Sequence, residues 1–465
     1  MTLAGERRRW IALVVVCLGQ LMMVLDVTIV NVALPSIQHD LRFTQASLTW
    51  VVNAYLITFG SFLLLAGRLG DLLGRKKVFL GGLATFTAAS VLCGLAQDQA
   101  VLVAARFLQG IGGAASSAVI VALLVTGFPR PDERATAMSV YTFVVSGGGS
   151  IGLLAGGLLT ESINWHWIFF INLPIGLLTL LLGAALVEEN QGIGIGQGID
   201  LLGSALVTVA MMAGVYAIVT ATDRGWGSAH TLGFGATAVG LLAAFLALEA
   251  RLANPILPLR ILRLRGLTTS SAVRALLATG MFSSFFLGAL YLEHVLGYGA
   301  IGTGLAFLPL TLAVGLLSTG ITARLVRRYG PKRTLVPGLL AIVAGLALLA
   351  RAGEHAGYFP GLFAAFALIG LGAGSSFMPL LAMAMAEVPM ADAGLASAIA
   401  NVSLQVSAAI GLAALGTIST DHTRALAAQG RSLAGALTGG YHLAFALAAA
   451  CVAAGALAAV GLLRS

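Results

Sequence analysis

The sequence predicts an all-α polytopic membrane protein, and three observations lead to this class: composition, apolar stretches and the placement of basic residues. Hydrophobic residues make up 58% of the 465 residues and charged residues only 9%, with a mean hydropathy of +0.97. A soluble chain with so few charged side chains would lack the polar groups to cover its surface. We therefore expect lipid to be its main surrounding.

Fourteen apolar stretches, each close to the roughly 20 residues that a helix needs to cross a bilayer, indicate fourteen transmembrane helices. We expect these spans near residues 10–33, 48–66, 78–96, 100–127, 135–159, 167–187, 201–220, 231–250, 268–291, 302–323, 334–351, 358–385, 393–418 and 440–463. Spans 1 to 6 and 9 to 14 then form two six-helix bundles, and spans 7 and 8 are an inserted pair. The predicted domains are a cytoplasmic N-terminus (1–9), an N-terminal bundle (10–187), the inserted pair with its loops (188–266) and a C-terminal bundle (267–465).

The basic residues predict the orientation of these spans. With the N-terminus inside, nineteen of the 26 Lys and Arg residues fall in cytoplasmic connectors, which normally carry the excess of positive charge. An even number of spans returns the C-terminus to the cytoplasm. The run that begins at Trp10 is too long for a signal peptide, so we expect it to remain as the first span. Abundant Ala and Gly with only three Lys are typical of a GC-rich bacterial genome, which indicates a bacterial inner membrane.

The two predicted bundles also share a repeated connector. The segment from Gly70 to Lys77 is echoed 256 residues later by the segment from Val326 to Arg333, and each follows the second helix of its bundle. Two parallel bundles around a midplane cavity are typical of secondary transporters that open alternately to the two sides of a membrane.

Two ionisable residues lie deep within apolar spans. Asp26 comes about sixteen residues into the first run, where a carboxylate costs roughly 2.5 to 3.5 kcal/mol on insertion scales. It should therefore face a cavity, unless it is a structural residue bonded to Thr28 or Asn31. Arg106 in the fourth span needs an acidic or a carbonyl partner, and we hypothesise that it pairs with Asp26.

Several motifs resemble those of one transporter family. The connector from Gly67 to Lys77 is similar to the hallmark loop of the major facilitator superfamily, and the stretch from Leu25 to Pro35 resembles the first-span signature of its fourteen-span drug:proton antiporters. The stretch around Arg106 resembles the family's buried-arginine motif. This likeness implies the major facilitator fold, proton coupling through Asp26 and Arg106, and a conformational latch made of Gly67, Asp71, Gly74 and Arg75.

The fifth span carries a glycine pattern that resembles the antiporter motif of exporters in this superfamily. Its residues are Gly148, Gly152, Gly156 and Gly157. The family usually has a proline where Leu153 stands, so a kink at this position should be weaker. Glycines at this spacing suit a hinge or gate, and plain helix packing is the alternative.

Polar residues elsewhere in the spans are candidates for lining a drug cavity. They are Asn31, Asn53, Tyr55, Gln109, Asn401 and Gln405, together with Asp26 itself. Trp and Tyr near span ends are more often membrane-interface residues, and small polar helix faces are more often packing. Glu293, at the outer end of the ninth span, is a candidate proton entrance or cation contact, although an exposed carboxylate at such a position more often has no role.

These residues predict an exporter of amphiphilic, cationic compounds that exchanges them for protons, by competition between the cation and the proton at Asp26. No nucleotide-binding loop, metal signature or nucleophile-and-base set stands in the sequence, so we expect no cofactor, no metal, no nucleic-acid partner and no enzymatic activity. The expected partners are the bilayer, small-molecule drugs and protons, with the protein as a monomer. A dedicated exporter of one metabolite, such as a self-made antibiotic, is the main alternative, and a non-transporting membrane receptor or scaffold is another.

Overall fold

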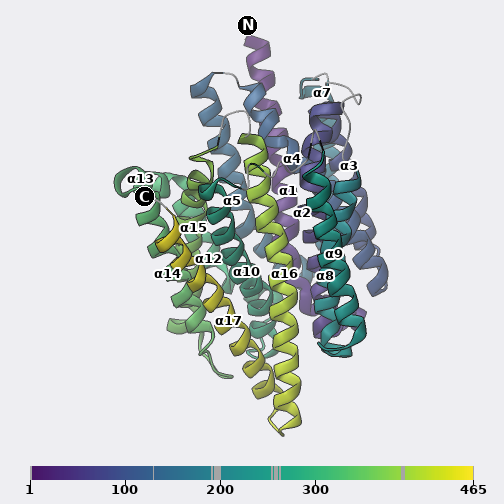
Figure 1. The fold of residues 1–465 in the computed structure, drawn as a ribbon, viewed down its shortest axis with the longest axis vertical. Helices are drawn as coiled ribbons and strands as arrows, with labels where there is room; N and C mark the ends of the chain where they lie inside the picture. Colours follow the sequence, from purple (N-terminus) through teal and green to yellow (C-terminus); the bar gives the residue numbers. More distant parts are fainter. Residues whose placement is uncertain are drawn as a thin grey trace.

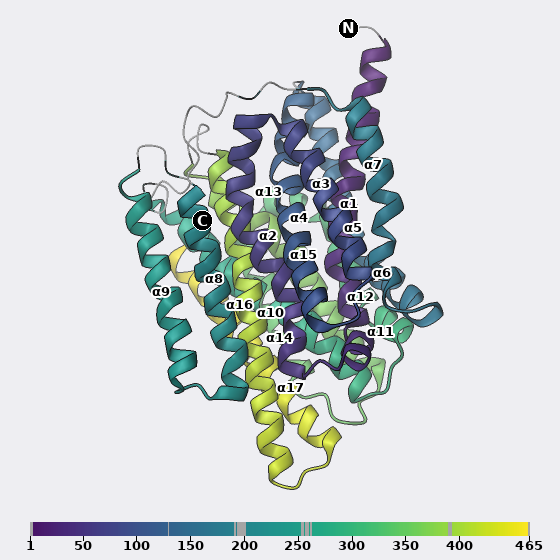
Figure 2. The same cartoon turned by 90° about the vertical axis from the view of Figure 1, so that its right-hand side faces the viewer.

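The computed structural model describes residues 3–128, 130–189, 192, 201–252, 255, 260, 263–388 and 393–463 of the chain. Within these residues it is almost entirely helical and contains no strand (Figure 1), which confirms the all-α class. Both ends of the chain lie toward the same end of the helix bundle, as Figure 2 shows.

The helices fall into three groups along the sequence. The first group consists of α1 (Leu3–Leu41), α2 (Gln45–Leu73), α3 (Arg75–Gly94), α4 (Gln99–Gly127), α5 (Pro131–Ser162), α6 (Trp167–Phe170) and α7 (Asn172–Leu186). Two helices follow, α8 (Leu201–Arg224) and α9 (Ala229–Glu249). The last group consists of α10 (Arg265–His294), α11 (Ala300–Ala306), α12 (Leu308–Leu316), η3 (Leu317–Ile321), α13 (Thr322–Tyr329), α14 (Pro331–Leu349), η4 (Tyr358–Leu362), α15 (Phe363–Met385), α16 (Ala393–Ala428) and α17 (Leu433–Leu462).

The described residues hold ten helices that are long and apolar enough to cross a membrane. Three shorter apolar stretches lie at Ser47–Leu63, Ile151–Ser162 and Ala300–Leu316. The chain is therefore a multi-pass membrane protein, while the count of fourteen spans and the domain boundaries stay predictions.

Two expected spans are broken helices in the structure. The expected span 302–323 is divided between α11, α12, η3 and α13, and the expected span 167–187 is divided at Ile171 into α6 and α7. The breaks at Ile171 and Phe307 lie shortly before Pro174 and Pro309, whose missing N–H and bulky ring prevent a regular helical bond to the preceding turn. The helices α16 and α17 are also longer than predicted and form a hairpin that projects beyond the neighbouring helices (Figures 1 and 2).

The helices α8 and α9 flank the seam between the first and last groups. The helix α8 packs on α9, and it contacts both α2 of the first group and α16 of the last (Figure 2). The Nε1 of Trp226, which follows α8, donates a hydrogen bond to Oδ2 of Asp421 in α16 at 3.1 Å. Thr417 of α16 donates to the backbone oxygen of Ile218 in α8 at 3.3 Å. The pair is thus attached to both groups.

The repeated connectors adopt the same local structure. Gly74 ends α2 with a φ of 102°, and Gly330, the equivalent residue 256 positions later, ends α13 with a φ of 87°. Residues other than glycine rarely adopt these positive angles. The Nζ of Lys76 donates to the oxygen of Ala184 near the end of α7 at 2.8 Å, and the Nζ of its equivalent, Lys332, donates to two carbonyls at the end of α17. The two lysines thus play the same role, because a cation stabilises the carbonyl end of a helix.

Candidate functional site

The first group of helices encloses a buried ion pair. Asp26, midway along α1, has no exposed surface, and Arg106 of α4 is 1% exposed. The guanidinium Nη1 of Arg106 donates to Oδ2 of Asp26 at 2.5 Å. The structure therefore brings together the two intramembrane charges that the sequence singled out.

Arg106 is held from several sides. Its Nε donates to the backbone oxygen of Val51 in α2 at 2.8 Å, and its Nη1 also donates to Oε1 of Gln109 at 2.6 Å. The ring of Tyr55 lies 4.6 Å from the guanidinium carbon, a cation–π distance. These contacts replace water around a guanidinium group that is costly to bury.

Asp26 has further partners on α4 and α7. Its Oδ1 accepts a hydrogen bond from Nε2 of Gln109 at 2.7 Å and a longer one from Nδ2 of Asn172 at 3.4 Å. Ser90 of α3 lies beside them: its Oγ accepts from Gln109 at 3.2 Å and from Asn172 at 2.9 Å. Cys93 of α3 donates its thiol hydrogen to Oε1 of Gln109 at 3.6 Å. We call Asp26, Ser90, Arg106, Gln109 and Asn172 the buried network.

Sequence reasoning missed Ser90, Cys93 and Asn172. Asn172 stands in a stretch that follows two tryptophans, but a single amide near a span end gives no sign of its neighbours. Ser90 and Cys93 are small residues of a kind that is common in membrane helices, where they usually serve packing. Only the approach of α3 and α7 to α1 and α4 shows that these side chains share one site.

The glycines of α5 form a face that packs on the segment of α1 around Asp26. A Cβ at Gly148 would lie 3.0 Å from side-chain atoms of Leu21 and Val24, and a Cβ at Gly156 would lie 2.8 Å from the backbone oxygen of Ile29. At Gly152 it would clash with the hydroxyl of Thr28. Residues four apart lie on one face of a helix, so these three positions bring α5 against α1 on both sides of Asp26.

A neighbouring face of α5 contacts the last group of helices. A Cβ at Gly157 would lie 2.8 Å from the oxygen of Ala300, at the start of α11. One at Gly304 of α11 would lie 2.8 Å from the oxygen of Leu153. Oε2 of Glu161 accepts a hydrogen bond from the backbone N–H of Ile301 at 3.0 Å. Because Gly299 before α11 has no side chain to cap that helix, Glu161 supplies the cap from the other group.

The other predicted binding residues have varied surroundings. Nδ2 of Asn31 donates to Val27 of its own helix at 2.8 Å. Asn53 of α2 is fully buried, and neither its Nδ2 nor its Oδ1 has a hydrogen-bond partner. Tyr55 belongs to the surroundings of Arg106, as described above. The side chains of Asn401 and Gln405 in α16 lie outside the described residues.

The predicted latch and the predicted proton entrance lie away from the buried network. Gly67 has no neighbour within 4 Å of where a Cβ would stand, and Gly74 is required by its positive φ. The side chain of Asp71 lies outside the described residues, and that of Arg75 is half-buried. Glu293 is in the last turn of α10, where its Oε2 is buried without a hydrogen-bond partner.

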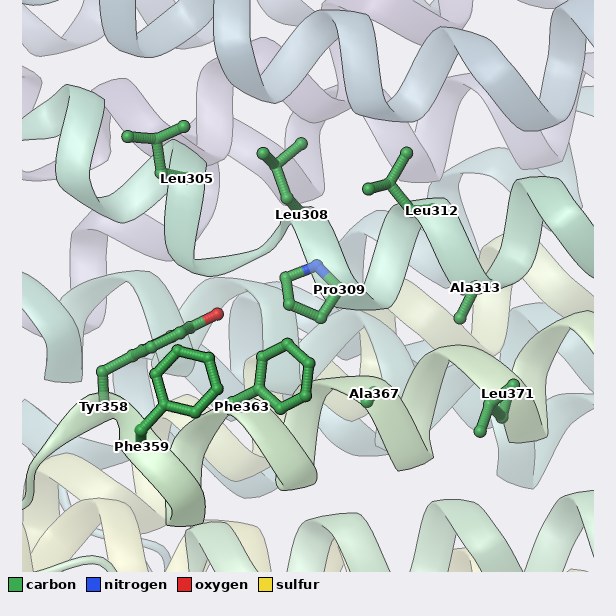
Figure 3. Close-up of a pocket in the computed structure, with 10 residues that line it drawn as sticks. All are labelled: Leu305, Leu308, Pro309, Leu312, Ala313, Tyr358, Phe359, Phe363, Ala367 and Leu371. Carbon is green, nitrogen blue, oxygen red and sulfur yellow. The ribbon is translucent and has the colours of Figure 1, made fainter.

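A groove on the last group of helices has a different character. It has a volume of about 400 Å³ and lies between the α11–α12 segment and the η4–α15 segment (Figure 3). Nine of its ten lining residues are apolar, and the hydroxyl of the tenth, Tyr358, donates to the oxygen of Ala306 at 3.0 Å. Because no charged side chain lines the groove, it suits a hydrocarbon chain and offers nothing to an ion.

The sequence of this chain matches the family model of the Major Facilitator Superfamily over residues 16–412. The chain belongs to the Major Facilitator Superfamily. This confirms the family that the connector from Gly67 to Lys77 indicated.

Relatives in the superfamily cover nearly the whole chain. The puromycin resistance protein of Streptomyces alboniger is 41% identical over 449 residues, which are 95% of this chain and 89% of the relative. The cephamycin export protein of Amycolatopsis lactamdurans is 34% identical and matches 89% of this chain and 85% of its own length. The multidrug resistance protein Stp of Mycobacterium tuberculosis H37Rv is 35% identical over 89% of this chain and 76% of its own length.

Solved structures of transporters share the fold. The POT family transporter PepTSo superposes with a TM-score of 0.71 at 15% identity, over 98% of both chains. A bacterial homologue of the lysosomal transporter Spinster, solved in an inward-facing conformation, superposes with a TM-score of 0.67 at 16% identity, over 98% of both chains. At these identities the likeness concerns the fold alone, and it confirms the major facilitator fold.

Proposed function

We propose that this protein exports small antibiotic-like molecules and exchanges them for protons. Export is supported by the relatives named for puromycin resistance, cephamycin export and multidrug resistance, each matched over most of its length. Proton exchange is supported by one observation above all: an aspartate with no exposed surface is paired with a buried arginine in the middle of the first bundle.

The proton acts by breaking this ion pair. The ionised carboxylate of Asp26 attracts Arg106, whereas a protonated carboxyl group is neutral and loses most of that attraction. The guanidinium then keeps its bonds to Val51 and Gln109, and the attachment of α1 to α4 is weakened. Since the glycine face of α5 packs on α1 around Asp26, and α5 also contacts α11, a shift of α1 is transmitted to the contact between the two bundles.

This mechanism differs from a direct competition between a cation and a proton for one carboxylate. Both oxygens of Asp26 are occupied by donors from the protein, so a cationic compound would have to displace Arg106 to reach them. We therefore place the drug outside the buried network and the coupling in the helix packing. Asn53, a buried amide whose hydrogen bonds are unmade, is our candidate for a polar contact with the drug.

The test uses proteoliposomes that hold the purified protein and a pH-sensitive dye. Addition of puromycin, a cephamycin or a lipophilic cation should dissipate an imposed proton gradient, and Asp26→Asn should abolish this response. Asp98→Asn is the matched control, because Asp98 caps the start of α4 outside the network and should leave the coupling intact. If the compounds still dissipate the proton gradient in Asp26→Asn, the mechanism is refuted.

A dedicated exporter of one compound is the second candidate. It is favoured by the relatives that carry the name of a single antibiotic. The same liposomes discriminate the two: responses to several unrelated compounds support a multidrug exporter, and a response to one compound alone supports a dedicated one.

We also propose that the protein works as a monomer in a bacterial inner membrane with both termini in the cytoplasm. The position of both chain ends toward one end of the bundle supports the last point. Reporter fusions to each end, one active only in the cytoplasm and one only outside, would test it.

A further inference from the structure

The hydrogen bonds around Asp26 suit an ionised carboxylate only. Gln109 and Asn172 donate to Oδ1, and Arg106 donates to Oδ2. A protonated carboxyl group would add an O–H donor to this site, and a buried donor needs an acceptor. The proton that Asp26 is proposed to carry therefore requires a partner that the ionised state does not use.

The buried network has one such acceptor free of hydrogen bonds. The Oγ of Ser90 already accepts from two amides, and Oε1 of Gln109 accepts from Arg106 and Cys93. Oδ1 of Asn172 has no hydrogen-bond partner, although the residue is only 1% exposed. This oxygen belongs to the same amide whose nitrogen lies 3.4 Å from Asp26.

We propose that Asn172 is a positioning residue for proton exchange at Asp26. Its Nδ2 donates to the ionised carboxylate, and rotation of the amide about its Cβ–Cγ bond turns Oδ1 toward the carboxyl O–H once the proton has bound. The proton passes between water and the carboxylate, and Asn172 itself gains and loses none. This inference rests on the proposed function, in which Asp26 carries the coupled proton.

The location of Asn172 leaves its amide available for this role. It is the first residue of α7, directly after the break at Ile171, and no side chain caps this helix end. Rotation of the amide breaks the bond from Nδ2 to Ser90, which keeps its second bond from Gln109.

Three other ionisable groups act on Asp26: Arg106 from α4, Tyr55 from α2 and Cys93 from α3. All three remain in place when Asn172 is substituted. A change in the hydrogen bond of protonated Asp26 between variants of Asn172 therefore reports residue 172 and not these charges.

The experiment compares two variants of the same shape, Asn172→Thr and Asn172→Val. Threonine keeps a hydroxyl that can accept the O–H of the acid, and valine does not. The purified protein is titrated with protons in detergent, and infrared spectroscopy follows the C=O stretch of protonated Asp26, identified by its loss in Asp26→Asn. In the protonated state, the C=O stretch should have the frequency of a hydrogen-bonded carboxyl group in the threonine variant and the higher frequency of a free O–H in the valine variant. The frequency reports the acid form alone, whereas the titration midpoint also depends on the donor that residue 172 offers to the ionised form.

Thr179→Val is the control for altered packing of α7, because the Thr179 hydroxyl bonds within its own helix and not to the network. It should leave the C=O frequency unchanged. Equal C=O frequencies in the valine and threonine variants would overturn the role of Asn172. If neither variant folds, the wild-type protein decides: a C=O frequency typical of a hydrogen-bonded carboxyl group supports the proposal, and one typical of a free O–H overturns it.

The same titration separates this inference from the proposed function. If no protonated carboxyl band is lost in Asp26→Asn and drug-driven proton flux persists, the proposed function fails. If the band and the flux are lost in Asp26→Asn but the valine and threonine variants show the same C=O frequency, only the role of Asn172 fails.

Discussion

The strength of the ion pair between Asp26 and Arg106 can be measured by a double-mutant cycle. Asp26→Asn leaves a buried guanidinium with two neutral acceptors, the oxygens of Val51 and Gln109. Arg106→Met leaves a buried carboxylate with the amides of Gln109 and Asn172. Removal of one partner of a buried pair typically lowers the free energy of unfolding by about 3 to 5 kcal/mol. Because neutral hydrogen bonds remain in both cases, we expect each loss near the lower end, about 3 kcal/mol.

The double variant should lose much less than the sum of the two, because it leaves no unpaired charge in the bundle. We expect a coupling energy of at least about 2 kcal/mol. The assay is unfolding in mixed micelles of dodecyl maltoside and increasing SDS at neutral pH, followed by tryptophan fluorescence. Losses that add to within about 0.5 kcal/mol would refute the reasoning, since they would show that the two side chains do not interact in the folded protein.

Three further predictions concern contacts between and within the bundles. Gly157→Val places a branched side chain where α5 touches α11, so spin labels at the outer ends of these helices should lie farther apart, and an unchanged separation would contradict the contact. Glu161→Ala removes the cap of α11, so the fraction of molecules in which the spin labels on α5 and α11 are far apart should rise by a small factor, on the order of threefold. An unchanged fraction would mean that this exposed hydrogen bond contributes nothing to the contact. Lys332→Met removes two hydrogen bonds to the end of α17 and should lower the free energy of unfolding by about 1 kcal/mol, whereas Lys77→Met, which loses only an exposed pair at 4.0 Å, should change it little. Equal effects of the two lysine substitutions would argue against a specific cap.

The fold class and the centre of the candidate site could be predicted from the sequence because they rest on strong signals. Long apolar runs have few alternatives to membrane helices, and a charge in the middle of such a run is rare enough to point to a buried partner. Asp26 and Arg106 were therefore recognisable one by one. Their contact could be hypothesised because the two spans belong to one bundle, and the ion pair is present in the structure.

Other features depend on tertiary contacts that leave no local pattern. Ser90 and Asn172 reach Asp26 because of the faces that α3 and α7 turn toward α1. The spacing of small polar residues in the sequence does not show which faces these are. The break before Pro309 was missed for another reason: prolines are tolerated within membrane helices, so hydropathy alone gives one continuous span. The hairpin of α16 and α17 extends beyond the apolar runs because helical hydrogen bonds continue past the point where hydrophobicity ends.

The attachment of α8 to both α2 and α16 makes the two flanks of this transporter unequal. On one flank the seam between the bundles is covered by the inserted helices, which shield it from the bilayer. On the other flank α5 meets α11 and α12, and no inserted helix among the described residues packs there; the apolar groove of Figure 3 is lined by α11, α12 and the η4–α15 segment. The two seams between the bundles therefore have different surroundings: one is bordered by the inserted helices, and the other lies near an apolar groove.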